Sequence, residues 1–141
     1  MRVNIGLLLF IPNRDVENRV LAAVNAAGFE VTQAQARVFM RVGADGSRLT
    51  ELAEAAQVTK QTAGFLVDQL VKAGYVERVP DPADGRARLV KVTEKALGAV
   101  PVANAELAKI EAEWERHLGR RRMAQLREAL EMLGEITDPY R

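Results

Sequence analysis

Two helical segments joined by a very short turn restrict the fold of this sequence more than any other feature. Residues 49–56 carry apolar side chains at helical spacing, and residues 57–59 follow as a turn. A second helix is predicted from Lys60 to Ala73, with Thr59 as its N-cap and Gly74 as its stop. Two helices separated by about three residues predict a helix-turn-helix.

A hairpin pattern follows the second helix directly. Residues 75–78 and 86–93 predict two strands, and the turn-forming stretch 80–85 separates them. A helix-turn-helix followed by a hairpin predicts a winged helix-turn-helix, which presents one helix to a DNA major groove and its hairpin to the neighbouring minor groove. We expect this domain to span residues 31–95.

Helical segments flank the predicted domain on both sides, over residues 1–30 and 96–141. Pro12 predicts either two successive helices or one kinked helix in the first segment. The fold class is therefore mainly α with a small β-hairpin wing (α+β). Because the central module buries only a modest core, we expect the flanks to form the dimerisation region of a homodimer. The alternative is that they fold back on their own domain.

The apolar stripes of the second flank support this expectation. They are interrupted by Gly119 and consist of Leu107, Ile110, Trp114 and Leu118, then Met123, Leu126, Leu130 and Leu133. Ahead of the helix-turn-helix, Thr32 and Gln35 have the spacing of a capping box, which predicts the start of another helix. Ser47 or Thr50 is expected to cap the helix over 49–56. The residues expected to face inward after the capping box are Ala36, Phe39 and Met40.

Composition excludes several classes of function. The sequence has no cysteine and a single histidine, so we expect no disulfide, no metal site and no thiol redox switch. It has no glycine-rich phosphate loop, nucleophile elbow or metal-binding triad, so we expect neither an enzyme nor a cofactor. The apolar run Ile5–Ile11 is too short to span a bilayer, and no cleavage site follows it. We therefore expect a cytoplasmic protein without a membrane partner.

Charge supports a nucleic-acid partner only locally. The net charge is +1, and residues 42–95 contain eight basic and eight acidic side chains. Between residues 84 and 91, however, Arg86, Arg88 and Lys91 are opposed only by Asp84. Affinity for phosphates depends on the local number of cations, so this stretch is the candidate for contact with DNA.

The start of the second helix holds the first group of candidate DNA-binding residues, which are Thr59, Lys60, Gln61, Thr62 and Gly64. Gln61 suits adenine, and Lys60 suits guanine or a phosphate. The threonine hydroxyls suit phosphates, and Gly64 permits a close approach of the backbone. The alternative for each residue is a solvated helix face.

The hairpin tip holds the second group. Arg86 follows the tight turn Asp84-Gly85, and a long, planar, permanently charged side chain there suits a narrow minor groove. Arg88 is a further candidate. Asp81 or Asp84 is expected to hold the Arg86 side chain by a carboxylate pair. The alternative is a hairpin whose charges only keep it soluble.

Five segments between about residues 31 and 96 carry a resemblance to a known family. They are TELA (50–53), VTKQT (58–62), LVDQL (66–70), GYVER (74–78) and DPADGRARLVKVTEK (81–95). In this order and at these spacings, the sequence resembles the MarR family of bacterial transcriptional regulators. With the helical flanks, the resemblance covers nearly the whole chain.

The resemblance implies a homodimeric winged-helix repressor or activator that binds a pseudo-palindromic operator in double-stranded DNA. The terminal helices would form the dimer, the helix over 60–73 would enter the major groove and Arg86 the minor groove, with Asp81 and Asp84 bracing that arginine. Many members release DNA when a small aromatic or phenolic anion binds between the dimer helices and the reading lobe. We expect a repressor that such a small lipophilic or aromatic ligand releases.

Several residues depart from the family pattern. Gln57 stands where glycine is frequent, Phe65 where a DNA-contacting arginine is common, and Ala96 where another glycine is frequent. Phe65 and the neutral central segment keep open an alternative function, a winged-helix module that binds protein without DNA. Residues that suit an effector pocket, but are more simply interpreted as surface residues, are Arg14, Arg19, Arg37, Arg41 and Trp114.

Overall fold

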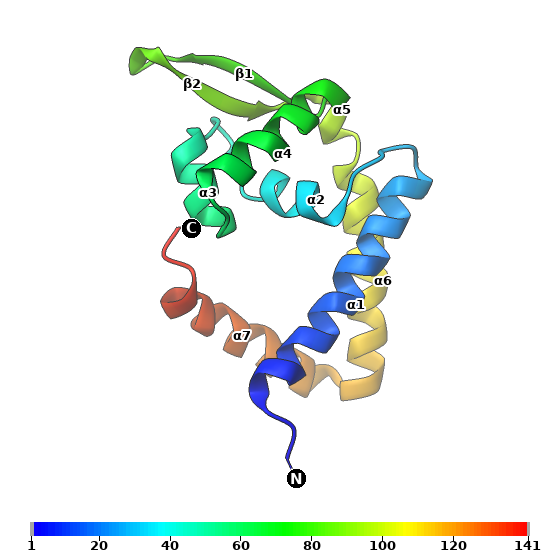
Figure 1. Cartoon of the computed structure of the whole chain (residues 1–141). Coiled ribbons are helices and arrows are strands. Elements are labelled where there is room, and N and C mark those ends of the chain that lie inside the picture. Colours follow the sequence, from blue (N-terminus) through cyan, green and yellow to red (C-terminus); the bar gives the residue numbers. More distant parts are fainter. Residues whose placement is uncertain (1, 141) are drawn as a thin grey trace. The chain divides into compact units, whose positions relative to one another are not determined.

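The chain forms two compact units in the computed structural model, which describes residues 2–140. The first, called here the helical unit, consists of Met1–Val31 and Ala99–Leu130. The second, the winged-helix unit, consists of Thr32–Gly98 and Glu131–Arg141. Figure 1 labels the helices and strands along the chain.

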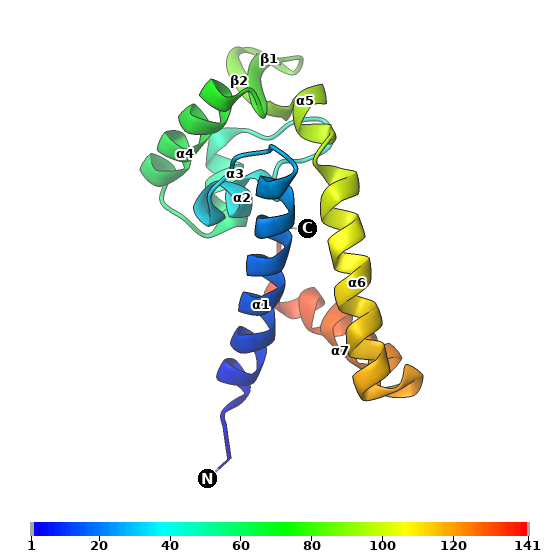
Figure 2. The same ribbon diagram turned by 90° about the vertical axis from the view of Figure 1, so that its right-hand side faces the viewer.

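The helical unit is built on the pairing of α1 (Ile5–Ala26) with α6 (Val100–Leu118), which Figure 2 shows next to each other. Pro12 lies inside α1, so the first segment is one continuous helix and not two. Arg19 of α1 donates two hydrogen bonds to Glu113 of α6, with Nη1 to Oε2 at 2.6 Å and Nη2 to Oε1 at 3.1 Å. Ile110 of α6 is fully buried.

The beginning of α1 is apolar on every side and exposed. Its large side chains from Ile5 to Ile11 each keep at least 43% of their surface accessible among the described residues. Large apolar side chains are also exposed on α7 (Arg120–Thr137), including Met132 and Ile136. Contiguous exposed apolar surface of this kind marks an interaction site in a soluble protein.

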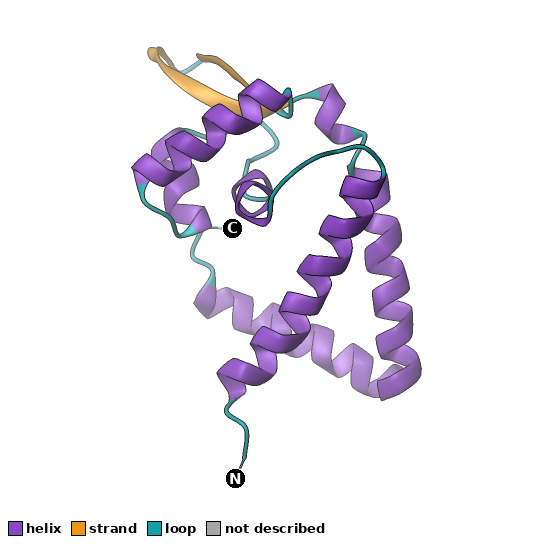
Figure 3. Cartoon of the chain, turned by 45° about the vertical axis from the view of Figure 1, so that its right-hand side comes forward, coloured by secondary structure: helices purple, strands orange, loops and turns teal. Residues whose placement is uncertain are grey.

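Between Thr32 and Gly98 the winged-helix unit contains four helices and one hairpin, and it also includes the end of α7; Figure 3 colours helices and strands by type. These are α2 (Gln33–Phe39), α3 (Leu49–Ala56), α4 (Lys60–Ala73), β1 (Val76–Asp81), β2 (Asp84–Val92) and α5 (Glu94–Leu97). Its core gathers side chains from all of them, among which Val38, Leu52, Val67, Leu70 and Val76 are at most 1% exposed. The mainly helical fold with a two-stranded hairpin confirms the predicted fold class.

The hairpin is antiparallel, and its register runs from the pair Val76–Val92 to the pair Asp81–Asp84. Ser47 adds an isolated bridge to the other side of β2, because its backbone N–H donates to Val90 (2.9 Å) and its carbonyl accepts from Val90 (2.8 Å). The base of the hairpin is therefore held on both edges of β2.

Several predicted helix ends are confirmed. Thr32 and Gln35 form both hydrogen bonds of a capping box, and Gly74 ends α4 in the left-handed conformation. Gln57 ends α3 with φ of 57°, a conformation that costs a residue other than glycine about 1–2 kcal/mol. After Ala96 the chain does not continue as one helix, because α5 ends at Gly98 before α6 begins.

Two local predictions are wrong. Neither Ser47 nor Thr50 caps α3; Arg48 occupies the N-cap position without a side-chain cap, while the Ser47 hydroxyl accepts the Gly43 N–H. Met40 is 76% exposed instead of facing inward, because α2 ends before it, and Val38 is the residue of α2 that is buried.

Within residues 2–140, none of the helices combines the length and apolar character that crossing a bilayer requires.

Candidate nucleic-acid interface

The start of α4 is organised by two threonines. Thr59 lies at the N-cap, where its Oγ1 accepts the backbone N–H of Thr62 at 3.0 Å. Its hydroxyl also donates to the Thr62 hydroxyl at 2.9 Å. The first turn is thereby fixed, and the helix end concentrates backbone N–H groups and positive potential where an anion would bind.

One face of α4 is exposed along its whole length. Ala63, Leu66, Val67 and Leu70 are buried against the unit, as predicted. The exposed residues of the other face include Lys60, Gln61, Thr62, Phe65 and Asp68. An added Cβ at Gly64 would make only an ordinary contact, 3.7 Å from a Leu49 methyl group. Packing inside the unit therefore does not require this glycine, which leaves close approach by an outside molecule as a reason for it.

The wing presents the second group of predicted residues. The tight turn predicted at Asp84-Gly85 lies instead at Pro82-Ala83, and Asp84 begins β2, where its Oδ1 accepts the backbone N–H of Arg86 at 3.0 Å. Arg86, Arg88 and Lys91 are all exposed on β2. Within residues 2–140, no ion pair or hydrogen bond engages the guanidinium of Arg86, so this cation is available to a partner outside the unit.

Asp81 does not hold Arg86, and this expectation from the sequence is corrected. Its Oδ2 accepts from Arg48 Nη2 at 2.8 Å and Nε at 3.0 Å, and its Oδ1 accepts the backbone N–H of Ala83 at 2.9 Å. Asp81 is the buried charged residue of the described chain. The pair joins the turn end of β1 to the residue just before α3, so Asp81 supports the wing near its turn, while the Asp84 carboxylate accepts from the Arg86 backbone and not from its guanidinium.

These contacts lower the pKa of Asp81. The Ala83 N–H and then the Arg48 guanidinium stabilise the ionised carboxylate, while partial burial acts in the opposite direction. Because the pKa is lower in the folded chain than in the unfolded one, the pair contributes its stability above about pH 4. That contribution is lost as the pH falls through the lowered pKa.

Thermal unfolding measured between pH 7 and pH 2.5 checks this prediction. The melting temperature of the wild-type protein should fall more steeply below about pH 4 than that of Asp81→Asn, which has no carboxylate to protonate. Asp45→Asn, which removes an exposed carboxylate from a loop of the same unit, serves as the control and should follow the wild-type curve. Parallel curves for wild type and Asp81→Asn would contradict the assignment.

A second ion pair was not predicted. Arg78 of β1 binds Asp68 of α4 through Nη2 and Oδ1, which ties the hairpin to the exposed face of α4. The pair also offsets the negative charge of Asp68 on that face. The spacing of residues does not predict the ion pairs of Arg48 and Arg78. Their partners lie 33 and 10 residues away in sequence, and neither separation matches the period of one helix or one strand.

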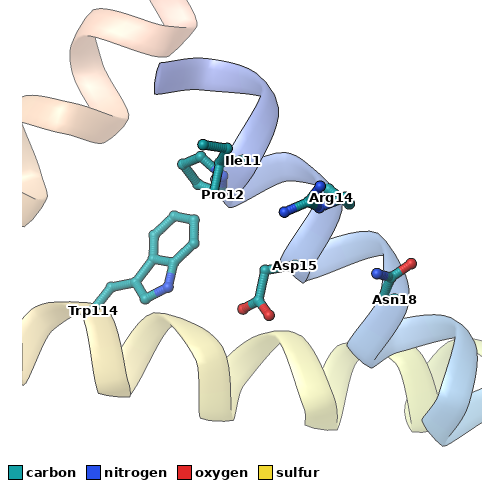
Figure 4. Close-up of a pocket in the computed structure, with 6 residues that line it drawn as sticks. All are labelled: Ile11, Pro12, Arg14, Asp15, Asn18 and Trp114. Atoms are coloured by element: carbon teal, nitrogen blue, oxygen red, sulfur yellow. The ribbon is translucent and has the colours of Figure 1, made fainter. Parts of the chain in front are cut away.

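Only some of the residues that would suit an effector pocket lie together. Arg14 and Trp114 line a cavity of about 490 Å³ in the helical unit, with Ile11, Pro12, Asp15 and Asn18. Figure 4 shows the Trp114 indole facing Ile11 and Pro12. Arg19 is instead bound to Glu113, and Arg41 donates two hydrogen bonds to Asp138 in the winged-helix unit.

Comparisons with known proteins agree with this architecture. Residues 19–87 match the model of the MarR family. The wild-type MarR of E. coli, in its apo form, is similar in structure with a TM-score of 0.74 and 23% sequence identity, over 94% of this chain and 98% of that chain. No curated protein sequence matches the chain.

Two further solved structures are similar to this chain. A probable transcriptional regulator from Pseudomonas aeruginosa has a TM-score of 0.68 and 23% identity, over 92% of this chain and 96% of that one. A point mutant of E. coli MarR, solved in complex with operator DNA, has a TM-score of 0.70 and 23% identity, over 91% of both chains. The MarR family match covers residues 19–87, and the fold of the chain is that of the MarR structures.

Proposed function

We propose that this protein is a sequence-specific, DNA-binding transcriptional regulator and not an enzyme. The observation that carries the proposal is that one folded unit presents both a capped, exposed helix start and an arginine at the hairpin tip. Lys60, Gln61 and Arg86 lie on these two elements. Winged-helix proteins are known to recognise a DNA duplex by placing one helix in the major groove and the wing in the minor groove. The structurally similar E. coli MarR mutant was solved with operator DNA, which supports the same partner here.

The proposed regulator acts as a homodimer on a pseudo-palindromic operator. The exposed apolar start of α1 and the exposed apolar residues of α7 require a partner, and a second copy satisfies both. Two-fold symmetry then presents two copies of α4 to half-sites about one helical turn, roughly 34 Å, apart. Dimerisation is thereby assigned to residues 1–30 and 96–141, and DNA binding to residues 31–95.

In its finer form the proposal is a repressor that a small aromatic or lipophilic ligand releases from DNA. The family supports this form, and the cavity beside Trp114 offers an apolar wall. Arg14 and Asp15 line the same cavity with opposite charges, so it does not select a simple anion. Trp114 is the single tryptophan of the chain, so its fluorescence reports ligand binding while a DNA-binding assay reports release.

A winged-helix module that binds protein is the second candidate, and the exposed Phe65 on α4 favours it. Selection of bound duplexes from a random pool, followed by titration at increasing salt, separates the two functions. Neutralisation of phosphates by Lys60, Arg86, Arg88 and Lys91 requires affinity to fall steeply with salt. An interface centred on Phe65 would instead give no enriched duplex and little dependence on salt.

Gln61→Ala tests base recognition by the helix. Its side chain is exposed at the second residue of α4, and an amide pairs with adenine through two hydrogen bonds. We expect the variant to lose preference at one base pair in each half-site, at a cost of about 1–3 kcal/mol there, while binding to other positions is unchanged. The same duplex selection, repeated with the variant, measures this. An unaltered preference would remove Gln61 from the reading residues.

A further inference from the structure

Phe65 is out of place for an apolar residue on a packed helix. Leu66, Val67 and Leu70 of α4 are at most 7% exposed, whereas Phe65 is 63% exposed. Leaving an aromatic ring in water forgoes the stabilisation that its burial would give. The ring therefore contributes little to the stability of the unit and is available to an outside partner.

The position of Phe65 on α4 restricts what that partner is. Long side chains on a helix lean toward its N-terminus, so the ring lies over the turn that carries Gln61 and Thr62. One turn further along, the Asp68 carboxylate is bound to Arg78, and Gln69 accepts a hydrogen bond from Gln35. The ring thus belongs to the part of α4 that would face base edges, while the residues behind it are engaged within the unit.

We propose that Phe65 determines specificity by contacting a thymine methyl group in the major groove, and this rests on the proposed function. The 5-methyl group of thymine is the apolar feature of the major-groove edge, and an aromatic side chain is suited to contact it. Gln61, four residues earlier on the same face, suits an adenine. The two side chains together would read neighbouring base pairs, one by hydrogen bonds and one by apolar contact.

A protein partner is less favoured by the surroundings of the ring. The exposed residues next to Phe65 on α4 are Gln61, Thr62 and Asp68, all of them polar. The apolar area at this place is therefore one side chain and not the contiguous patch that protein interfaces bury. A methyl group is a target of matching size.

Replacement of single thymines by deoxyuridine tests the proposal, since only the methyl group is removed. The duplex is one selected with the wild-type protein, and each thymine is replaced in both half-sites in turn. At one position we expect binding about fourfold weaker per half-site, the effect of losing one buried methyl-sized group. Phe65→Ala should bind the thymine and uracil duplexes equally at that position, whereas Phe65→Leu should retain a preference for thymine.

The measurement is made at low salt, so that the variants stay bound through their phosphate contacts. The control is Met40→Ala, which removes another exposed apolar side chain of the same unit. The control should keep the wild-type preference for thymine. The proposal is overturned if Phe65→Ala retains that preference, if the wild type distinguishes thymine from uracil nowhere, or if folded Phe65→Ala binds neither duplex. Failure of the wild type to bind any duplex would overturn the proposed function as well.

Discussion

Arg86→Ala is expected to lower affinity for every duplex, and most strongly for duplexes whose flanks are rich in A·T pairs. Among the described residues no side chain pairs with the Arg86 guanidinium, which lies on β2 close to the hairpin turn, so its loss removes contacts to DNA and leaves the fold intact. A charged hydrogen-bonding group contributes about 1.5–3 kcal/mol per wing. Two wings in a dimer make the expected loss about 100-fold or more. Narrow A·T-rich minor grooves attract arginine most, which explains the dependence on the flanks.

Fluorescence anisotropy on duplexes with A·T-rich and G·C-rich flanks measures this effect. Arg86→Lys keeps the charge without the planar fork and should lose mainly the dependence on the flanks. Arg121→Ala, which removes an exposed arginine from α7, is the control for net charge alone. Equal affinities for the wild type and Arg86→Ala would show that the wing does not contact DNA.

Phe10→Asp is expected to convert the proposed dimer to a monomer. Phe10 lies in the exposed apolar start of α1, and the dimer would bury it twice, once from each copy. Burial of an ionised carboxylate in an apolar contact costs several kcal/mol, so association should fail at micromolar concentrations. The mass in solution should then be 15.5 kDa instead of twice that value.

The same variant should also bind a full operator more weakly by at least about 100-fold, because the advantage of two linked half-site contacts is lost. Circular dichroism should remain that of the wild type, since the Phe10 side chain is exposed within its own chain. Met40→Asp places the same charge on another exposed apolar residue and should leave the mass unchanged. A Phe10→Asp protein that remains dimeric would exclude the start of α1 from the interface.

Local signals were sufficient to predict most of the winged-helix unit. The capping box at Thr32, the N-cap at Thr59 and the stop at Gly74 depend on hydrogen bonds that span only a few residues. The buried face of α4 follows from helical spacing alone. The turn-forming stretch 80–85 predicts a hairpin, but β1 continues to Asp81 and β2 begins at Asp84, so the turn is shorter than predicted.

Contacts between distant segments could not be predicted in this way. The partner of Asp81 lies 33 residues earlier, and a carboxylate next to an arginine in the same turn is the simpler expectation from sequence. The bridge between Ser47 and Val90 withdraws Ser47 from capping α3, although the residue type suits a cap. Exposure of Met40 follows from where α2 ends, and helix boundaries are the least certain part of a pattern.

The double anchorage of the wing has a consequence for regulation. Ser47 fastens the base of the hairpin and Arg48 its turn end to the chain just before α3, and Arg78 fastens β1 to α4. In the proposed regulator, the distance between the major-groove contact of α4 and the minor-groove contact of the wing is then fixed within each copy. In the proposed dimer, an inducer would change the separation of the two α4 helices and leave the base preference of each copy unchanged. Operators with altered spacers should therefore report induction, whereas operators with altered bases should not.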